Sequence, residues 1–94
     1  MTNEELLRKY YAEHDEDALA QLYEQNIDLL WSIARKSAKA FGCAESEVLD
    51  DLVSEGILAF SEVIYKGSYD EAKGKLTTYV YPFIKGAMHR WLES

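Results

Sequence analysis

Apolar residues recur every three or four positions along almost the whole chain, and this spacing limits the fold more than any other feature. Near the N-terminus, Leu6, Leu7, Tyr10 and Tyr11 fall on one face of a helix. The 94 residues include only one proline and five glycines, the two residue types that interrupt helices most strongly. The pattern therefore predicts an all-α fold.

Polar and glycine-containing breaks divide the chain into four expected helices. These helices span residues 3–14, residues 16–41, a segment from near Ser46 or Asp51 to Lys66, and a segment from Thr77 or Thr78 to about Leu92. Asp15 or Asp17 is suited to cap the second helix, and Gly42 and Gly67 follow helices where left-handed backbone is favoured. We expect a compact bundle of about four helices, forming a single domain over residues 1–94.

Two of the expected helices show clear core faces. The apolar stripe of the second helix comprises Leu19, Leu22, Tyr23, Leu30, Ile33, Ala34, Ala38 and Phe41, and that of the third comprises Leu52, Gly56, Ala59, Phe60 and Val63. Glycine costs a helix about 1 kcal/mol relative to alanine, so Gly56 predicts a close approach by a crossing helix. Trp31 lies beside the apolar stripe of the second helix, either at the edge of the core or on a contact surface. Pro82 falls within or just after the first turn of the last helix.

The charge of the chain is distributed unevenly. The net charge is −7, which argues at first against nucleic acid as a partner. Residues 1–68 hold 14 acids and 6 bases, whereas residues 69–94 hold three acids and four bases. Six acids and no lysine or arginine lie between Cys43 and Tyr65. This asymmetry indicates a basic partner for the middle of the chain and an anionic partner for its end.

Several classes of function find no support in the sequence. The two histidines are far apart, and there is no glycine-rich phosphate loop, nucleophile motif or metal-ligand spacing, so neither an enzyme nor a cofactor or metal site is expected. The acidic run 45–55 lacks the alternating oxygen ligands and central glycine of a calcium loop. A single cysteine excludes an internal disulfide, and no apolar run is long enough to span a membrane. The cytoplasm is the expected location.

Three stretches in fixed order carry a family resemblance. Residues 51–60, DLVSEGILAF, are similar to the D-L-I-Q-E-G-N-I-G-L segment of bacterial sigma factors, and residues 74–88, GKLTTYVYPFIKGAM, to their G-x-K-F-S-T-Y-A-Y-W-W-I-R-Q-A-I segment. A weaker match joins residues 22–36 to L-x-x-x-N-L-R-L-V-x-S-I-A-K-K. The chain thus resembles region two of a sigma factor of RNA polymerase, of the alternative type.

The resemblance implies a non-enzymatic transcription initiation module with two partners. The acidic third helix matches the surface that docks on the basic clamp coiled coil of core polymerase, with Asp50, Asp51, Ser54 and Glu55 at the matching positions. An acidic segment also suits a basic partner on physical grounds. An anti-sigma factor or a separate region-four subunit is a further partner that the resemblance allows.

The last helix matches the family's helix that recognises or melts the minus-ten element of the promoter by binding its non-template strand. Tyr79 falls on the position that stacks a flipped base, although core packing is the alternative for this tyrosine. The DNA-binding set that the resemblance implies is Asn26, Leu29, Lys75, Thr78, Tyr79, Phe83, Lys85, His89 and Arg90. Asn26 and Leu29 match a pocket for a second flipped base, Lys75, Lys85 and Arg90 match phosphate contacts, and His89 matches a reader of the upstream base pair.

Several departures from the family pattern leave alternatives open. Pro82 and Phe83 replace paired tryptophans, which predicts a smaller melting wedge, and Asp28 stands where a basic residue is usual. A sigma-like protein that binds polymerase or a regulator without DNA is therefore a rival, and an unrelated acidic adaptor is another. The chain stops at Ser94, before a helix-turn-helix for the minus-thirty-five element. It is expected to be part of a longer protein or a region two that acts as a separate subunit.

Overall fold

The computed structural model describes residues 1–43 and 45–94, including all their side chains except those of Glu45 and Ser46. Its elements in chain order are α1 (Asn3–Glu13), α2 (Glu16–Ala40), α3 (Glu45–Lys66), the short 3-10 helix η1 (Glu71–Lys73) and α4 (Leu76–Glu93). No strand occurs among the described residues. The predicted all-α class with about four helices is therefore confirmed.

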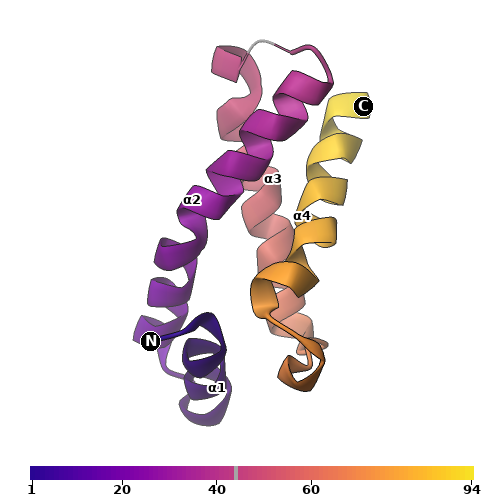
Figure 1. Cartoon of the computed structure of the whole chain (residues 1–94). Helices are drawn as coiled ribbons and strands as arrows, with labels where there is room; N and C mark the ends of the chain where they lie inside the picture. The colour runs from indigo at the N-terminus through magenta and orange to yellow at the C-terminus, as the bar shows by residue number, and fades with distance from the viewer. Residues whose placement is uncertain (44) are drawn as a thin grey trace.

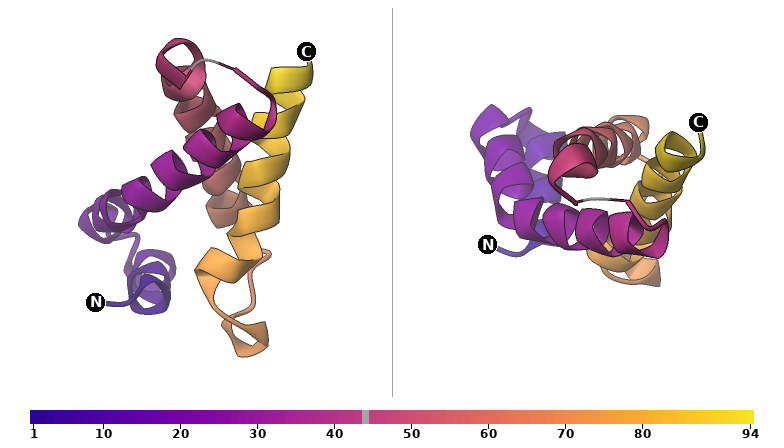
Figure 2. Two further views of the ribbon diagram at one scale, coloured as in Figure 1. Left: turned by 45° about the horizontal axis from the view of Figure 1, so that its top comes forward. Right: turned by 90° about the horizontal axis from the view of Figure 1, so that it is seen from above.

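The three long helices pack against one another, and α1 packs on the first part of α2 at one end of the molecule (Figure 1). The two further views show α3 lying between α2 and α4 over part of its length, with the C-terminus at the end opposite α1 (Figure 2). The molecule measures 42 × 24 × 19 Å. This arrangement leaves one side of α3 and one side of α4 on the surface.

Local sequence signals set most of the helix ends. The Asp15 carboxylate accepts hydrogen bonds from the backbone N–H groups of Asp17 at 3.0 Å and Ala18 at 3.1 Å, so of the two predicted candidates Asp15, and not Asp17, caps α2. Gly42 and Gly67 have φ angles of +68° and +65° beyond the ends of α2 and α3. Glycine adopts this left-handed backbone without a Cβ clash, which explains why both helices end there.

The end of α1 uses a residue that is poorly suited to its backbone conformation. His14 has φ 52° and ψ 39°, and its backbone N–H donates to the Tyr10 carbonyl at 2.8 Å. A residue with a side chain pays roughly 1–2 kcal/mol in this left-handed region. Replacement by glycine should therefore stabilise the fold.

We expect His14→Gly to raise the free energy of unfolding by about 0.5–1 kcal/mol, because relief of backbone strain exceeds the extra flexibility of the unfolded chain. Urea denaturation followed by circular dichroism measures this change. Glu13→Gly is the matched control, since Glu13 is the last residue of α1 and glycine within a helix costs up to about 1 kcal/mol. A loss of stability in His14→Gly would contradict this account.

The core runs between the three long helices. Its largest side chains with less than 2% of their surface exposed are Leu6, Leu22, Leu30, Leu52, Phe60, Ile64, Leu76, Val80, Ile84 and Met88. Gly56 lies where α3 meets both neighbours. A Cβ added there would lie 2.7 Å from Met88 Cε, 3.1 Å from Leu30 Cδ2 and 3.3 Å from Ile84 Cγ2. The predicted close approach at Gly56 is confirmed, with α2 and α4 as the two approaching helices.

Two predictions about the edges of the core have different outcomes. Phe41 was expected in the core, but it follows the last residue of α2 and is 37% exposed, so this prediction is wrong. Its ring meets His89 edge-on at 5.0 Å between centroids. Trp31 is partly buried against the core, and the Arg35 guanidinium lies 6.0 Å from its ring centroid, which is the core-edge alternative.

The start of α4 also differs from the prediction. The helix begins at Leu76 rather than near Thr77 or Thr78, and the described side chain of Lys75, its N-cap residue, makes no capping hydrogen bond. Pro82 consequently lies in the second turn, on the exposed side. Proline has no N–H, so the Thr78 carbonyl lacks its usual donor four residues ahead.

Candidate functional site

One side of α3 forms an acidic surface, which we define as Glu47, Asp50, Asp51, Ser54, Glu55 and Glu62. All are exposed except Glu55, which was expected to be exposed and is half-buried. Spacings of three and four residues place Asp51, Ser54, Glu55 and Glu62 along the same side of the helix. The opposite side carries the buried stripe of Leu52, Gly56, Phe60 and Val63, so packing of that stripe holds the acids outward.

The carboxylates of the acidic surface have no cationic partner within the described part of the chain. The ion pairs found there are Arg8–Glu71 and Lys9–Asp15, and both join residues outside α3. Uncompensated carboxylates on a rigid helix attract a basic partner and repel an acidic one. The acidic surface is thus available for an intermolecular contact.

Two large apolar side chains interrupt the acidic surface, and sequence reasoning missed them. Leu58, four residues after Ser54, is 60% exposed. Tyr65, three residues after Glu62, is 66% exposed. Exposed apolar groups rimmed by charge are typical of protein interfaces. Leu58 lies two residues from both Gly56 and Phe60, so its position off the buried stripe was a signal in the sequence that it faces solvent.

The first half of α4 carries an aromatic row. The Tyr79 ring lies between Tyr69, at 5.5 Å, and Phe83, at 5.3 Å between centroids. Its hydroxyl lies 3.1 Å from Ser68 Oγ, and its side chain is only partly buried. The ring therefore packs on its neighbours and keeps an exposed portion, and base stacking on Tyr79 stays a prediction.

Tyr69 anchors the loop that precedes α4. Its hydroxyl donates to the Gly74 carbonyl at 2.6 Å. Burial, and then the nearby carboxylates of Glu4 and Glu71, raise the pKa of Tyr69 above its usual value. Tyr69, Lys75, Thr78 and Tyr79 together line a small cavity of about 160 Å³ at the base of the row, with Asp70, Lys73 and Gly74.

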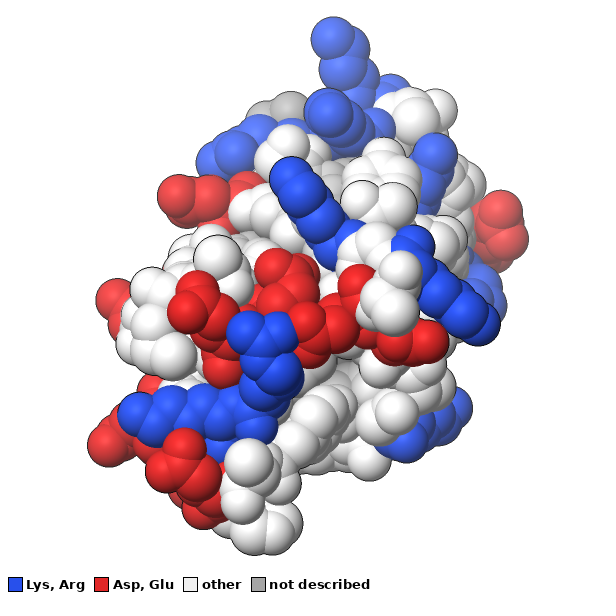
Figure 3. Space-filling model, turned by 60° about the horizontal axis from the view of Figure 1, so that its bottom comes forward, with Lys and Arg blue, Asp and Glu red and all other residues white. Residues whose placement is uncertain are grey.

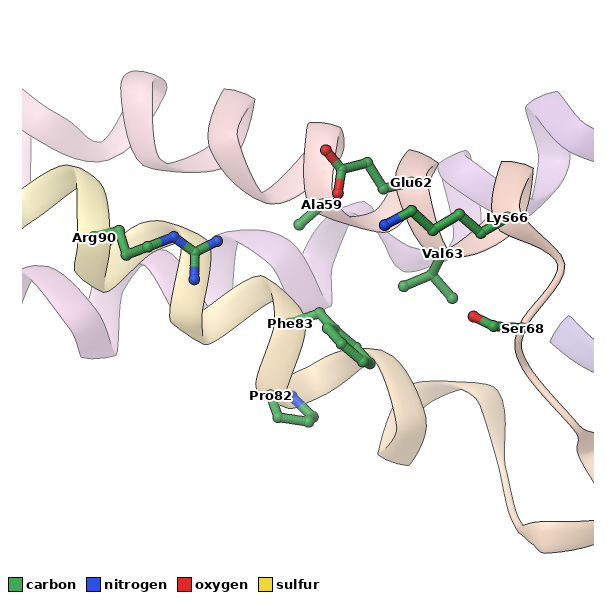
Figure 4. Close-up of a pocket in the computed structure, with 8 residues that line it drawn as sticks. All are labelled: Ala59, Glu62, Val63, Lys66, Ser68, Pro82, Phe83 and Arg90. Carbon is green, nitrogen blue, oxygen red and sulfur yellow. The ribbon is translucent and has the colours of Figure 1, made fainter.

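Phe83 continues the aromatic row into a groove between α3 and α4. The groove has a volume of about 240 Å³ and is lined by Ala59, Glu62, Val63, Lys66, Ser68, Pro82, Phe83 and Arg90. Lys66 and Glu62 from α3 and Arg90 from α4 lie around the groove, with Phe83 on its α4 side and Val63 on its α3 side (Figure 4). The groove thus has one aromatic ring, two cations and the Glu62 carboxylate. The ring suits an unstacked base, and the two cations suit its phosphates.

Asn26 and Leu29 line a more open depression on the other side of Lys75. This depression, of about 620 Å³, is formed by Thr2, Asn3, Glu4, Gln25, Asn26, Leu29, Lys75 and Thr77. Asn26 is 4% exposed, and its amide nitrogen donates to the Leu22 carbonyl at 2.7 Å and to Asn3 Oδ1 at 2.8 Å. Lys75 lines both this depression and the cavity of Tyr79, so the two adjoin.

Lys85 and His89 lie apart from the aromatic row. With Ile33, Lys36, Ser37, Ala40 and Tyr81 they line a second groove, of about 250 Å³, between α2 and α4. Lys85 Nζ lies 6.0 Å from the centroid of the Tyr81 ring. The structure therefore divides the predicted DNA-binding residues into a continuous path through Arg90, Phe83, Tyr79, Lys75 and Leu29, and a separate basic groove.

Other kinds of site are not seen in the described residues. No group of three or more His, Cys, Asp or Glu side chains among them is arranged to hold a metal ion. Within residues 1–43 and 45–94, no helix combines the length and apolar character needed to cross a bilayer.

The comparison with known proteins agrees with the geometry. The model of the family described as Sigma-70 region 2 matches residues 22–94, which include α3, α4 and all but the first six residues of α2. No curated protein and no solved structure shows significant similarity to the chain. Region 2 of sigma factors is a non-enzymatic transcription factor domain. The chain therefore belongs to the sigma-70 region 2 family and has a sigma-factor-like role in transcription initiation.

Proposed function

We propose that this chain docks on core RNA polymerase through the acidic surface of α3 and captures the non-template strand of the minus-ten element along α4. The observation that carries the proposal is that the bundle presents two unlike surfaces, which adjoin at Glu62. One is acidic with exposed apolar groups, and the other is an aromatic path with cations at its rim. We place this activity in the bacterial cytoplasm, where transcription takes place.

Polymerase docking combines charge and apolar contact in this proposal. A basic helical partner, the clamp coiled coil of the largest subunit, is steered and oriented by Asp50, Asp51, Ser54 and Glu55. Leu58 adds the apolar anchor that interface energetics usually require, because charged pairs at a rim contribute mainly to association rate and specificity.

Strand capture uses the aromatic path. Tyr79 and Phe83 offer ring faces to unstacked bases, and Lys75 and Arg90 lie beside them to meet phosphates. Thr78 is exposed next to Tyr79, where its hydroxyl is a suitable backbone contact. Lys85 and His89 line a separate groove, and we propose that they contact the duplex upstream of the opened bases.

The docking half of the proposal is tested by charge reversal. Asp51→Lys should weaken binding to core polymerase by about 1–2 kcal/mol, because the change removes an attraction and introduces a repulsion. Glu55→Lys should act in the same direction. Equilibrium binding to core polymerase by anisotropy measures the effect.

Glu24→Lys is the matched control, since it makes the same charge change at an exposed position of α2. Circular dichroism should report the same helix content for all three variants. Equal affinity of wild type, Asp51→Lys and Glu55→Lys for core polymerase would remove the acidic surface from the interface.

A second candidate function is binding to polymerase or to a regulator, such as an anti-sigma factor, without direct DNA contact. The net charge of −7 and the exposed Asp28, where the family usually has a basic residue, favour it. Polymerase binding with no effect on promoter-strand affinity would select this candidate. A separate region-four subunit is a further proposed partner. Such a subunit should co-purify with this chain in complexes of polymerase on a full-length promoter.

A further inference from the structure

The first turn of α1 connects α2 to the start of α4. Asn3 Oδ1 accepts hydrogen bonds from Gln25 Nε2 at 2.7 Å and Asn26 Nδ2 at 2.8 Å, and Asn3 Nδ2 lies 3.3 Å from Asn26 Oδ1. These bonds fix the turn on the second helix. The next residue, Glu4, faces the other way and reaches the last helix.

Glu4 supplies a cap that α4 does not supply itself. Its Oε2 accepts a hydrogen bond from the Leu76 backbone N–H at 2.9 Å, across 72 positions of sequence. Leu76 is the first residue of α4, where backbone N–H groups lack intrahelical partners. A carboxylate at this end also interacts favourably with the helix dipole. Glu4 therefore satisfies one of the N–H groups left free at the start of α4.

The same carboxylate lies beside the aromatic row. Glu4 Oε2 is 3.5 Å from the Tyr69 hydroxyl, and the Tyr69 ring packs on Tyr79. The ion pair between Arg8 and Glu71 adds a second link from α1 to the loop before α4. Figure 3 looks toward this end of the molecule, where carboxylates and cationic side chains crowd together over α1 and the loop.

We infer that Glu4 is a positioning residue for strand capture, acting through the first turn of α4 to hold the Tyr79 ring in its binding orientation. The inference rests on the proposed function and extends it to α1, which lies outside the residues that the family model matches. Glu4 itself need not touch the strand, since its hydrogen-bonding oxygen is directed at the protein backbone.

The test compares Glu4→Ala with Glu4→Gln, which keeps an oxygen acceptor, and with Glu13→Ala, an exposed control on the same helix. In the presence of core polymerase, Glu4→Ala should weaken binding to a single-stranded minus-ten oligonucleotide about three- to tenfold, the worth of one hydrogen bond. Glu4→Gln should recover most of this loss, and Glu13→Ala should bind as wild type.

A double-mutant cycle separates positioning from a general loss of structure. In a Tyr79→Leu background, Glu4→Ala should cause little further loss, because its effect passes through the ring. Amide hydrogen exchange at Leu76, measured without DNA, should be about three- to tenfold faster in Glu4→Ala than in Glu13→Ala.

Unchanged exchange at Leu76, or an equal effect of Glu4→Ala with and without the Tyr79 ring, would overturn the inference. Failure of the wild-type protein to bind the strand would overturn the proposed function, and with it any role of Glu4 in capture. Faster exchange at Leu76 would then still show that Glu4 caps α4. The two failures are therefore distinguishable.

Discussion

Phe60→Ala should lower the free energy of unfolding by about 3–5 kcal/mol, the cost of removing a large side chain from a packed interior. Phe60 is 1% exposed and packs against Tyr23 at 5.4 Å between ring centroids. Leu52→Ala should cost about 2–5 kcal/mol for the same reason, since Leu52 is fully buried. Urea denaturation followed by circular dichroism measures both changes.

Leu58→Ala provides the control within the same helix. Leu58 lies two residues before Phe60 but is 60% exposed, so its truncation should change stability by less than about 0.5 kcal/mol. The same variant should weaken polymerase binding if Leu58 anchors the docking surface. Similar stability losses for Phe60→Ala and Leu58→Ala would mean that the faces of α3 are assigned incorrectly.

Local signals in the sequence predicted the helices well, because each depends on neighbours in the chain. Asp15 caps α2 by binding N–H groups two and three residues ahead, and Gly42 ends it through its own backbone freedom. Gly56 predicted a helix crossing because glycine within a helix lowers its stability, and a closely packed neighbouring helix is a reason to keep it there. Such effects are visible from a few residues.

Features that depend on distant segments could not be predicted in the same way. The N–H group of the first residue of α4 is capped by Glu4, which lies 72 positions away, whereas the sequence pointed to the nearby Thr77 or Thr78 as the cap. Phe41 continues the apolar spacing of α2, but the helix ends at Ala40. The Phe41 side chain therefore lies beyond the helix and outside the core.

The residues of the candidate site were available from the sequence, but their grouping was not. Tyr79 and Lys85 are six residues apart on one helix, but Tyr79 lines a cavity formed with the loop before α4, whereas Lys85 lines the groove between α2 and α4. Asn26 matches the family pattern, yet only the structure shows that its amide is buried and engaged by Asn3. Tertiary packing decides which surfaces adjoin.

Loss of the Tyr79 ring should produce the largest effect on strand binding. Tyr79→Leu keeps apolar bulk against Tyr69 and Phe83 but offers no ring face, so it should lose about 1–3 kcal/mol of affinity for a single-stranded minus-ten oligonucleotide. Tyr79→Phe keeps the ring and removes only the hydroxyl near Ser68, so it should bind almost as wild type. Thermal melts establish that each variant is folded.

Lys85→Ala tests whether Lys85 contacts the phosphates of the DNA, as opposed to the base stacking expected of Tyr79. As a phosphate contact, Lys85 should strengthen binding to all sequences equally, so its removal should weaken binding without changing base preference and should reduce the salt dependence. Duplex of the same sequence should bind more weakly than single strand, because the bases must first be unstacked and unpaired.

The most direct test is fluorescence anisotropy of a labelled non-template minus-ten strand titrated with the core polymerase complex of wild type, Tyr79→Leu or Tyr79→Phe. The account predicts binding by wild type and Tyr79→Phe, and an affinity roughly 5- to 150-fold lower for folded Tyr79→Leu. Equal affinity of folded Tyr79→Leu and wild type would contradict base stacking on Tyr79 and leave the ring as a packing element. Absence of strand binding by every complex would contradict strand capture and favour a protein that contacts polymerase alone.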